Sequence, residues 1–303
     1  MAKTYFVFSD VHSFYDELMT ALNENGFDIN NPDHIIISCG DIFDRGTKPL
    51  EVYNFLRDLP KERRILIRGN HEILLKDLVK KGYEDSYDVH NGTFDTLCYL
   101  AKEPTRYEFL NQILFKGRCN KYGTPEYEAE RKKEKELIDK RTLKLFNNKK
   151  TKEIINWIFS DEWVDYYELG KYIFVHSFIP LKYKTVTLGN ESFDTGEKYY
   201  FKDWRTMSSD YEWEQATWGC PWSEYENGMF KEEEADGKVL VCGHWHTSDF
   251  WNSLDYATDK EKQLAQDNNP IYKSDKYPGL IGLDACTVLS HKVNVLVLKE
   301  NEL

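Results

Sequence analysis

The sequence has no long apolar run and no closely spaced cysteines, and both absences narrow its class. No stretch of the 303 residues approaches the roughly 20 apolar residues of a membrane-spanning helix. The six cysteines are scattered, without the spacing of a zinc finger or a redox pair. The first residues, MAKTYFVF, have no apolar leader ahead of a cleavage site and run directly into a strand pattern. We therefore expect a cytoplasmic protein with reduced thiols and no membrane segment.

The chain is also short of positive charge. Its 40 lysines and arginines face 52 aspartates and glutamates, which gives a formal net charge of −12 and a pI near 5.2. An acidic surface repels phosphate backbones, so general nucleic-acid binding is disfavoured. The same charge repels a small anionic substrate unless bound cations reverse the potential locally.

Apolar strand patterns recur along the chain, and the first three alternate with helical patterns. Strands are predicted at 4–8, 34–38, 64–68, 172–175, 238–242, 280–283 and 292–298. Helical spacing predicts helices from 14 to a stop at Gly26, from 49 to 59 and from 72 to 81. This alternation is typical of a layered α/β fold, in which the chemistry collects at the carboxyl ends of the strands.

Three longer segments do not fit this alternation and are interpreted as insertions, at about 83–165, 184–236 and 252–278. The first is rich in lysine and glutamate and predicts a solvated helix with ion pairs along it. The other two are irregular, with scattered glycine, proline, asparagine and aspartate. Because the chain has no internal repeat and no low-complexity linker, we expect a single domain over 1–303.

Polar motifs directly follow five of the predicted strands. They contain five of the eight histidines, three aspartates and one asparagine: Asp10, His12, Asp41, Asp44, Asn70, His71, His176, His244 and His246. A lone histidine at a strand end is usually structural, but burying this many ionisable groups is costly unless cations satisfy them. Imidazole, carboxylate and amide ligands suit zinc, manganese or iron. The absence of thiolate from the motifs argues against a structural zinc site.

Written out, the five motifs are Ser9-Asp10-Val11-His12, Gly40–Gly46, Arg68–Glu72, Val175-His176 and Gly243–His246. Their order and spacing resemble the signatures of the calcineurin-like metallophosphoesterases. The second and third are similar to those of the phosphoprotein phosphatase branch, which contains serine/threonine protein phosphatases and symmetrical diadenosine tetraphosphatases. The resemblance runs from residue 4 to about 298. It implies a four-layer α/β/β/α sandwich of two mixed sheets flanked by helices, with a helical insertion around 83–165.

The resemblance also implies a role for each matching position. A first divalent ion would be held by Asp10 and His12, with His246 completing its site as the second histidine does in the wider superfamily. Asp41 would bridge to a second ion, which would be held by Asn70, His176 and His244. Two cations roughly 3.5–4 Å apart clamp a phosphoryl group, and a hydroxide between them attacks phosphorus in line. Manganese is the expected metal, with iron, zinc and magnesium as alternatives.

Three further residues are candidates for the chemistry itself. Arg45 has the planar fork that holds phosphate oxygens. His71 is the candidate acid that protonates the leaving oxygen, and Asp44 would orient it and raise its pKa. Plainer interpretations remain. Asp44 also fits a turn, and Arg45 and Arg68 fit structural ion pairs. Glu72 fits a first-turn helix carboxylate or a salt-bridge partner better than a ligand.

The sequence departs from the family pattern at positions that would bind the substrate. Phe178 stands near the place where glycine is usual, so it is expected to narrow the site or lie over a substrate. The stretch 216–222 lacks the second phosphate-binding arginine that is common in this branch, and Arg205 is the one arginine between the last two histidine motifs. Six of the eight tryptophans fall within 204–251. We interpret them as an aromatic core or, alternatively, as a platform that stacks a base.

Three functions stay open at this point. The first is a phosphomonoesterase that acts on phosphoserine or phosphothreonine, with a phosphorylated protein, a peptide or a small phosphoester as its substrate. The second is a nucleotide hydrolase of the symmetrical diadenosine tetraphosphatase kind. The third is a catalytically silent scaffold, which would be expected to have lost at least one ligand or the acid.

Overall fold

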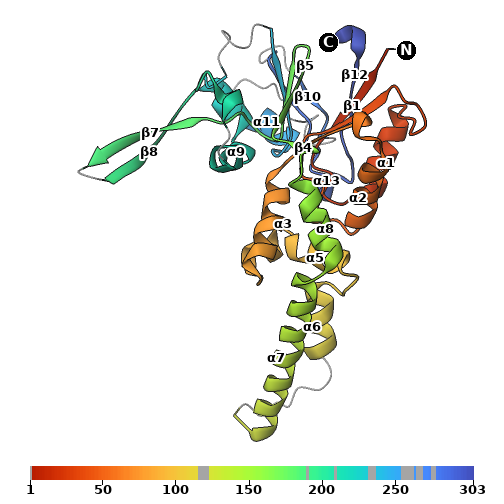
Figure 1. Cartoon of the computed structure of the whole chain (residues 1–303), viewed down its shortest axis with the longest axis vertical. Helices are drawn as coiled ribbons and strands as arrows, with labels where there is room; N and C mark the ends of the chain where they lie inside the picture. The colour runs from red at the N-terminus through yellow and green to blue at the C-terminus, as the bar shows by residue number, and fades with distance from the viewer. Residues whose placement is uncertain are drawn as a thin grey trace.

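Two five-stranded mixed sheets form the centre of the fold (Figure 1). The computed structural model describes residues 2–114, 123–188, 191–207, 210–230, 237–253, 263, 269–273 and 278–303. The first sheet has the order β12 (Leu296–Lys299), β1 (Thr4–Phe8), β2 (His34–Ser38), β3 (Arg64–Ile67), β4 (Trp163–Val164). The second has the order β10 (Tyr272–Lys273), β11 (Leu280–Gly282), β9 (Val239–Cys242), β6 (Tyr172–Val175), β5 (Tyr166–Leu169). Strands β1 to β4 are parallel, as are β11, β9 and β6. The first sheet has one antiparallel edge strand, β12, and the second has two, β10 and β5.

The two sheets pack face to face. Successive side chains of a strand point to opposite faces, so every second residue faces the other sheet. In β1, Tyr5 and Val7 point into a layer shared with Phe174 of β6 and Val241 of β9. Phe6 and Phe8, the alternate residues of β1, point the other way into a core formed with helices. Strands buried on both faces are near-continuous apolar runs, which is why the sequence patterns found them.

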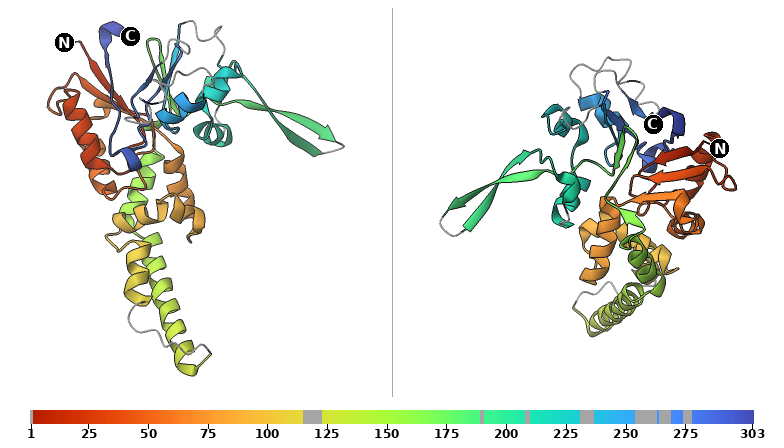
Figure 2. Two further views of the ribbon diagram at one scale, coloured as in Figure 1. Left: turned by 180° about the vertical axis from the view of Figure 1, so that it is seen from behind. Right: turned by 45° about the horizontal axis from the view of Figure 1, so that its top comes forward.

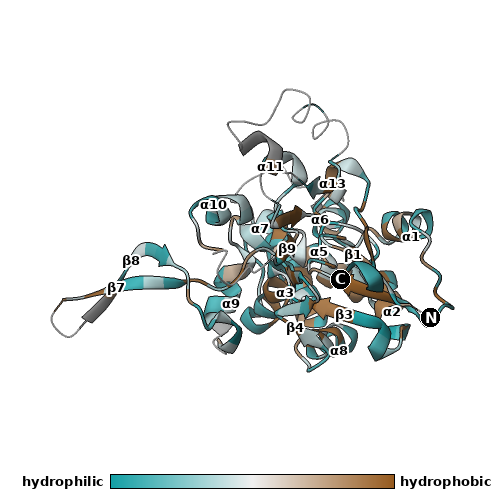
Figure 3. Ribbon diagram, turned by 90° about the horizontal axis from the view of Figure 1, so that it is seen from above, coloured by the Kyte–Doolittle hydropathy of each residue, from teal (hydrophilic) through white to brown (hydrophobic). Residues whose placement is uncertain are grey.

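Helices cover the outer face of each sheet, so the fold has four layers. On the first sheet lie α1 (Tyr15–Glu24), α2 (Pro49–Asp58), α3 (Asn70–Lys81), α5 (Thr93–Leu100) and α8 (Lys149–Ile158). On the second lie α9 (Asp210–Thr217), α10 (Pro221–Glu226) and α11 (Thr247–Ser253). Figure 3 shows hydrophobic residues gathered on the central strands and hydrophilic ones on the outer elements. The expected fold of two mixed sheets flanked by helices is confirmed.

The insertion at 83–165 is helical, as expected, and most of it stands away from the sheets. It contains α4 (Ser86–His90), α6 (Arg106–Leu114) and the long α7 (Pro125–Phe146), besides α5 and α8. Thr124 caps α7 by accepting the N–H of Tyr127. Only the last turns of α7 are buried, and Figures 1 and 2 show α6 and α7 together as a projecting arm.

The segment 184–236 is not irregular throughout, so that expectation is wrong. Strands β7 (Lys182–Leu188) and β8 (Glu191–Tyr199) form a two-stranded antiparallel ribbon that projects from the body (Figure 2). Both strands are mostly polar, and β7 is largely exposed, so they lack the continuous apolar run by which the other strands were found. Parts of the expected insertions at 184–236 and 252–278 lie outside the described residues.

The remaining elements are short. They are α13 (Thr287–Ser290) and the 3-10 turns η1 (Lys61–Arg63), η2 (Trp204–Thr206) and η3 (Glu300–Glu302). Within the part of the chain that the structure describes, no helix combines the length and the apolar character that crossing a membrane requires.

Candidate metal centre

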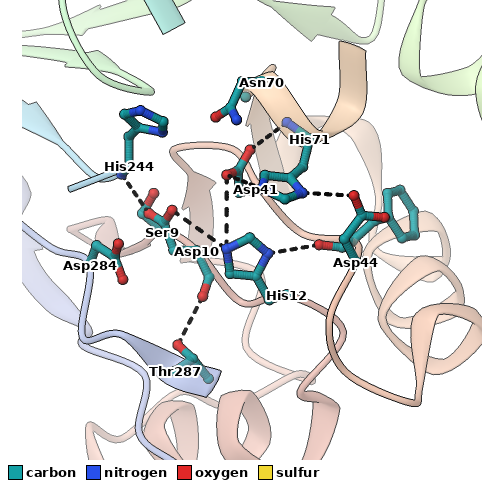
Figure 4. A network of polar contacts seen from close by, with 12 residues as sticks. Ser9, Asp10, His12, Asp41, Asp44, Asn70, His71, His244, Asp284 and Thr287 are labelled. Atoms are coloured by element: carbon teal, nitrogen blue, oxygen red, sulfur yellow. Dashed lines mark hydrogen bonds and ion pairs between the residues drawn. The ribbon is translucent and has the colours of Figure 1, made fainter. Parts of the chain in front are cut away.

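The carboxyl ends of strands from both sheets meet at one place. His176, after β6, contacts the Cys39 carbonyl oxygen after β2 through its Nδ1 at 2.8 Å. The backbone N–H of His244, after β9, donates to Asp10 Oδ2, after β1, at 2.9 Å. Residues that lie 137 and 234 positions apart in the sequence therefore become neighbours. Figure 4 shows the resulting network.

The backbone of this junction is strained. Asp10, His12, Asp41, Asp44 and His244 all adopt positive φ values, of 53°, 48°, 53°, 73° and 66°. Left-handed backbone is uncommon for residues other than glycine, and it clusters at functional sites because the surrounding structure must hold it in place. This backbone conformation directs the side chains into the space between the carboxyl ends of the strands.

One group of candidate ligands consists of His12, Asp41 and His71, whose ligand atoms lie within 4.8 Å of one another. His12 Nδ1 lies 2.9 Å from the Phe43 carbonyl oxygen, so this nitrogen carries the proton and donates it. His12 Nε2 then presents a lone pair, 3.9 Å from Asp41 Oδ2 and 4.0 Å from Asp10 Oδ1.

A second group consists of Asp41, His176 and His244. His176 Nδ1 donates to Cys39, which leaves a lone pair on its Nε2. That lone pair faces Asn70 Oδ1 at 2.7 Å and Asp41 Oδ1 at 3.4 Å. Asp41 belongs to both groups, and each of its oxygens faces one of them.

These residues fit divalent cations. Lone pairs that converge without a proton between them repel one another unless a positive charge lies among them. Ligand atoms about 2.0–2.2 Å from one ion stand roughly 3–4 Å from each other, which is the spacing around Asp41. Histidines that bind metal usually donate their other ring N–H to a carbonyl or carboxylate, as His12 and His176 do here.

Burial controls the protonation of the group. It lowers the pKa values of His12, His71 and His244 well below the usual range, and neighbouring histidines or Arg45 lower them further. It also raises the pKa of Asp41, to which the nearby Asp10 charge adds. The imidazoles are therefore neutral and able to donate lone pairs.

The sequence match to known families agrees with this geometry. The family model described as calcineurin-like phosphoesterase matches residues 3–248, which is most of the chain. The chain belongs to the calcineurin-like phosphoesterase family. The resemblance inferred from the five motifs is confirmed.

Curated relatives match shorter parts of this phosphoesterase. The symmetrical bis(5'-nucleosyl)-tetraphosphatase of Buchnera aphidicola subsp. Baizongia pistaciae is 36% identical over 73 residues, which is 24% of this chain and 25% of that protein. The protein of the same name from Nitrosococcus oceani is 32% identical over 108 residues, 36% of each chain. The matched region thus spans at most 36% of these relatives' length. A protein serine/threonine phosphatase from Saccharomyces cerevisiae has a similar structure, with a TM-score of 0.46 and 12% identity, covering 98% of this chain and 79% of that chain.

His71 and Asp44 of the phosphoesterase are paired. His71 Nδ1 lies 2.7 Å from Asp44 Oδ2, which also accepts the hydroxyl of Thr93 at 2.6 Å. Burial raises the pKa of Asp44 to about 7. The expectation that Asp44 raises the pKa of His71 is wrong for this structure, because burial and then the Arg45 charge lower it. Asp44 therefore orients the ring instead of charging it.

Three arginines singled out in the sequence, Arg45, Arg68 and Arg205, have different surroundings. Arg45 is exposed, and its guanidinium makes no hydrogen bond or ion pair with the described residues, so it is free to meet a ligand. Arg68 donates to Asp165 from Nε at 2.9 Å and from Nη2 at 2.7 Å, which supports the structural interpretation. Arg205 pairs with Glu168, and its Cζ lies 4.3 Å from the Trp204 ring centroid, which favours a structural role for it.

His246 is not drawn into either group of ligands. Its side chain is 36% exposed, with Nδ1 3.5 Å from Asp249 Oδ2 and Nε2 3.9 Å from Asp284 Oδ2. Its role as a ligand of the first ion stays a prediction. Asp284, the buried partner, was not among the predicted site residues.

Two buried carboxylates lie outside the predicted site residues: Glu72, which the sequence already placed in the first turn of a helix, and Asp284, which sequence reasoning missed. Glu72 accepts backbone N–H groups and makes no ion pair with a described residue. Asp284 follows β11 as the other site residues follow their strands, which is the one signal that would have found it. Burial raises the pKa values of both, and for Asp284 the next cause is the charge of Asp10.

The aromatic residues near the site divide into core and rim. Phe178 is buried in the outer core of the second sheet, so the expectation that it lies over a substrate is wrong. Trp204 and Trp213 are buried in the same core, which supports the core interpretation for them. Trp218 differs: it is 38% exposed, and its ring lies 5.4 Å from that of His244.

Proposed function

We propose that the chain is a metal-dependent hydrolase of phosphoester bonds that uses two divalent cations. The observation that supports this most is the pair of ligand groups that share Asp41. When bound, such cations polarise the phosphoryl oxygens and provide a nucleophile at neutral pH. Manganese is the first metal to supply, since the donors are imidazole, carboxylate and amide.

The side chains around the cations have separate tasks in this proposal. Asp10 and His12, whose Oδ1 and Nε2 lie 4.0 Å apart, hold one cation, which leaves His71 of the first ligand group for proton transfer. Asp41 holds both cations, and the other one is held by Asn70, His176 and His244. Arg45 is exposed and unpaired among the described residues, so its fork can bind phosphate oxygens. These positions fix the phosphoryl group before reaction, which is where most of the catalytic effect of such sites arises.

His71 delivers the proton to the leaving oxygen. Its Nδ1 is held by Asp44 at 2.7 Å, which leaves Nε2 directed toward the Asp41 side of the site, 3.9 Å from Oδ2. A bound phosphate dianion beside the ring favours the imidazolium, opposing the effect of burial. His71 is then charged when substrate is present and gives its proton from Nε2.

The first candidate substrate is a phosphomonoester, phosphoserine or phosphothreonine in a peptide. The motifs Gly40–Gly46 and Arg68–Glu72 favour it. The second candidate is a dinucleoside tetraphosphate. Two observations support the second: both curated relatives carry that activity in their names, and the exposed ring of Trp218 stands beside His244, where a base can stack.

The decisive experiment compares variants and substrates together. Hydrolysis of p-nitrophenyl phosphate with manganese is measured for the intact chain, Asp41→Asn and His71→Asn. Asp77→Asn and His291→Asn, at exposed positions, are the matched controls. Loss of activity in both site variants and neither control supports the proposal. Loss of activity in Asp41→Asn alone would mean that His71 does not protonate the leaving oxygen.

Substrate class is settled by the same preparation. Rates on a phosphoserine peptide and on diadenosine tetraphosphate are compared at equal enzyme concentration. A metal-loaded chain that hydrolyses none of the three substrates contradicts the proposal and favours the silent scaffold.

A further inference from the structure

Asp284 is a buried carboxylate held against the candidate metal centre. It is 3% exposed. Its backbone is fixed from two directions, since the N–H of Leu283 donates to the Cys242 carbonyl at 2.8 Å and the N–H of Thr247 to the Asp284 carbonyl at 2.9 Å. Three residues later, the Thr287 hydroxyl donates to the Asp10 carbonyl at 2.8 Å. In Figure 4, Asp10 lies between Asp284 and His12.

The two oxygens of Asp284 differ in their surroundings. Oδ1 accepts the backbone N–H of Cys286 at 2.7 Å and closes a local turn. Oδ2 accepts no hydrogen bond from a described residue, and its contact with a nitrogen is with His246 Nε2 at 3.9 Å. That distance is too long for a hydrogen bond. An oxygen of a buried carboxylate that accepts no hydrogen bond from the described residues is available to a cation.

The spacing matches that of the other candidate ligands. His12 Nε2 lies 3.9 Å from Asp41 Oδ2 and 4.0 Å from Asp10 Oδ1, nearly the same separation as that of His246 and Asp284. Such pairs are farther apart than hydrogen-bonded atoms and as far apart as two ligands of one ion. The two buried carboxylates of Asp10 and Asp284 also repel each other unless a cation lies near both.

We propose that Asp284 is a carboxylate donor of the metal centre, which together with Asp10 and His246 closes the side of the first cation position that faces away from His12. The proposal rests on the proposed function in that it requires a divalent cation to be bound beside Asp10. It also gives the half-exposed His246 a partner across the ion and explains why a turn with left-handed Cys286, φ 54°, is docked on Asp10.

The test removes the negative charge of Asp284 and keeps the turn that its side chain forms with Cys286. In Asp284→Asn the amide oxygen can still accept the N–H of Cys286, so a purely structural role predicts no change. We expect the variant to bind one of the two manganese ions at least about 10-fold more weakly than the intact chain, as measured by calorimetric titration and by metal content after dialysis. We also expect a smaller rise in melting temperature on adding manganese. In chelator the variant should melt at a higher temperature than the intact chain, because a buried charge beside Asp10 is gone.

Two further variants make the result specific. Asp249→Asn makes the same substitution at the carboxylate beside the other ring nitrogen of His246, 45% exposed, and should leave both ions bound. Its loss of the same ion would mean that Asp284 acts only by orienting His246. Asp284→Ala removes the turn as well, and should lose the same ion as Asp284→Asn while melting lower in chelator.

The outcomes separate this inference from the two-cation proposal. If the intact chain holds two ions and Asp284→Asn holds both with unchanged affinity, Asp284 is not a donor and the inference is overturned. If the intact chain holds a single ion, the two-cation proposal fails by itself. Asp284 is then judged on that ion: weaker binding in Asp284→Asn supports it as a donor, and unchanged binding overturns it.

Discussion

The carboxylate of Glu72 holds the backbone of Asp41 in place. Its Oε2 accepts the N–H of Asp41 at 2.9 Å and that of Gly69 at 2.8 Å, and its Oε1 accepts the N–H of Ile42 at 3.0 Å. Three N–H donors, one at the N-cap of α3 and two in the motif after β2, compensate the buried negative charge. Glu72 thereby joins the motif after β2 to the motif after β3, and it leaves both oxygens of Asp41 directed at the ligand groups.

Glu72→Gln should therefore weaken metal binding without touching a metal ligand. The amide nitrogen cannot accept, so at least one of the backbone N–H groups loses its partner, which costs about 1–3 kcal/mol of unfolding free energy. We expect manganese affinity to fall about 10-fold as Asp41 shifts. Glu51→Gln, exposed on α2, is the control for denaturant unfolding and metal titration. Equal values for both variants would mean that Glu72 does not position Asp41.

Gly69→Ala should damage the same bridge by a steric route. A Cβ at Gly69 would lie 2.1 Å from Asp41 Oδ1, so the carboxylate must move out of the ligand groups. We expect loss of manganese binding and of p-nitrophenyl phosphate hydrolysis by more than about 100-fold. Gly82→Ala is the control, because its Cβ meets open space although φ is +77°. It should lower stability by about 1–2 kcal/mol and leave metal binding intact, and a Gly69→Ala enzyme that keeps its activity would contradict the argument.

The strand ends were predictable because each signal is local. A buried strand is an apolar run, and a polar motif directly after it is visible in a few residues, as for Asp10 after β1 and His176 after β6. Asp284 was missed although the strand before it was predicted, because the carboxylate stands alone after β11, Leu280–Gly282, with no histidine beside it. Asp284 lies near Asp10 only in the folded chain, and a separation of 274 positions leaves no local pattern that reveals it.

The electrostatic role of Asp44 was also beyond the sequence. Its position beside His71 follows from the motif, but the direction of the pKa shifts depends on burial. Both groups are almost fully buried, and desolvation is the largest cause of the pKa shift of each. The ribbon of β7 and β8 was missed for the opposite reason: its stability does not come from burial, which is the signal that the strand patterns detect.

Asp44→Asn should change how stability depends on pH. The pKa of Asp44 is raised from 3.8 to about 7 by burial, so the folded chain keeps a proton that the unfolded chain loses near pH 4. The contribution of Asp44 to the free energy of unfolding is therefore most favourable below about pH 4. It falls by about 1.4 kcal/mol per pH unit as the pH rises from there toward 7. The asparagine variant lacks this term and can still accept from His71 and Thr93.

The measurement is denaturant unfolding in chelator at pH 5, 6 and 7. Stability of the variant relative to the intact chain should rise by about 2–3 kcal/mol over this range. Asp77→Asn, exposed on α3, should show no such trend. A constant difference between the intact chain and Asp44→Asn would show that Asp44 is already ionised in the folded chain at pH 5.

Trp218→Ala should separate the two candidate substrates. The ring is 38% exposed and stands edge-on to His244, at an interplanar angle of 87°. Its position is fixed by the next residue, because the Gly219 carbonyl accepts the indole N–H of Trp245 at 2.7 Å. A ring held in this way offers a surface on which a base can stack, worth about 1–3 kcal/mol.

For diadenosine tetraphosphate we expect KM to rise about 10-fold in Trp218→Ala, with kcat nearly unchanged, because stacking acts on the bound substrate and not on the reacting atoms. For a phosphoserine peptide, KM should stay within about 2-fold, since its side chain has no ring to stack. Trp218→Phe keeps a ring and should recover most of the lost affinity. Equal losses on both substrates would indicate that the ring instead positions His244. No loss on either would remove the stacking argument and favour the phosphoserine or phosphothreonine substrate.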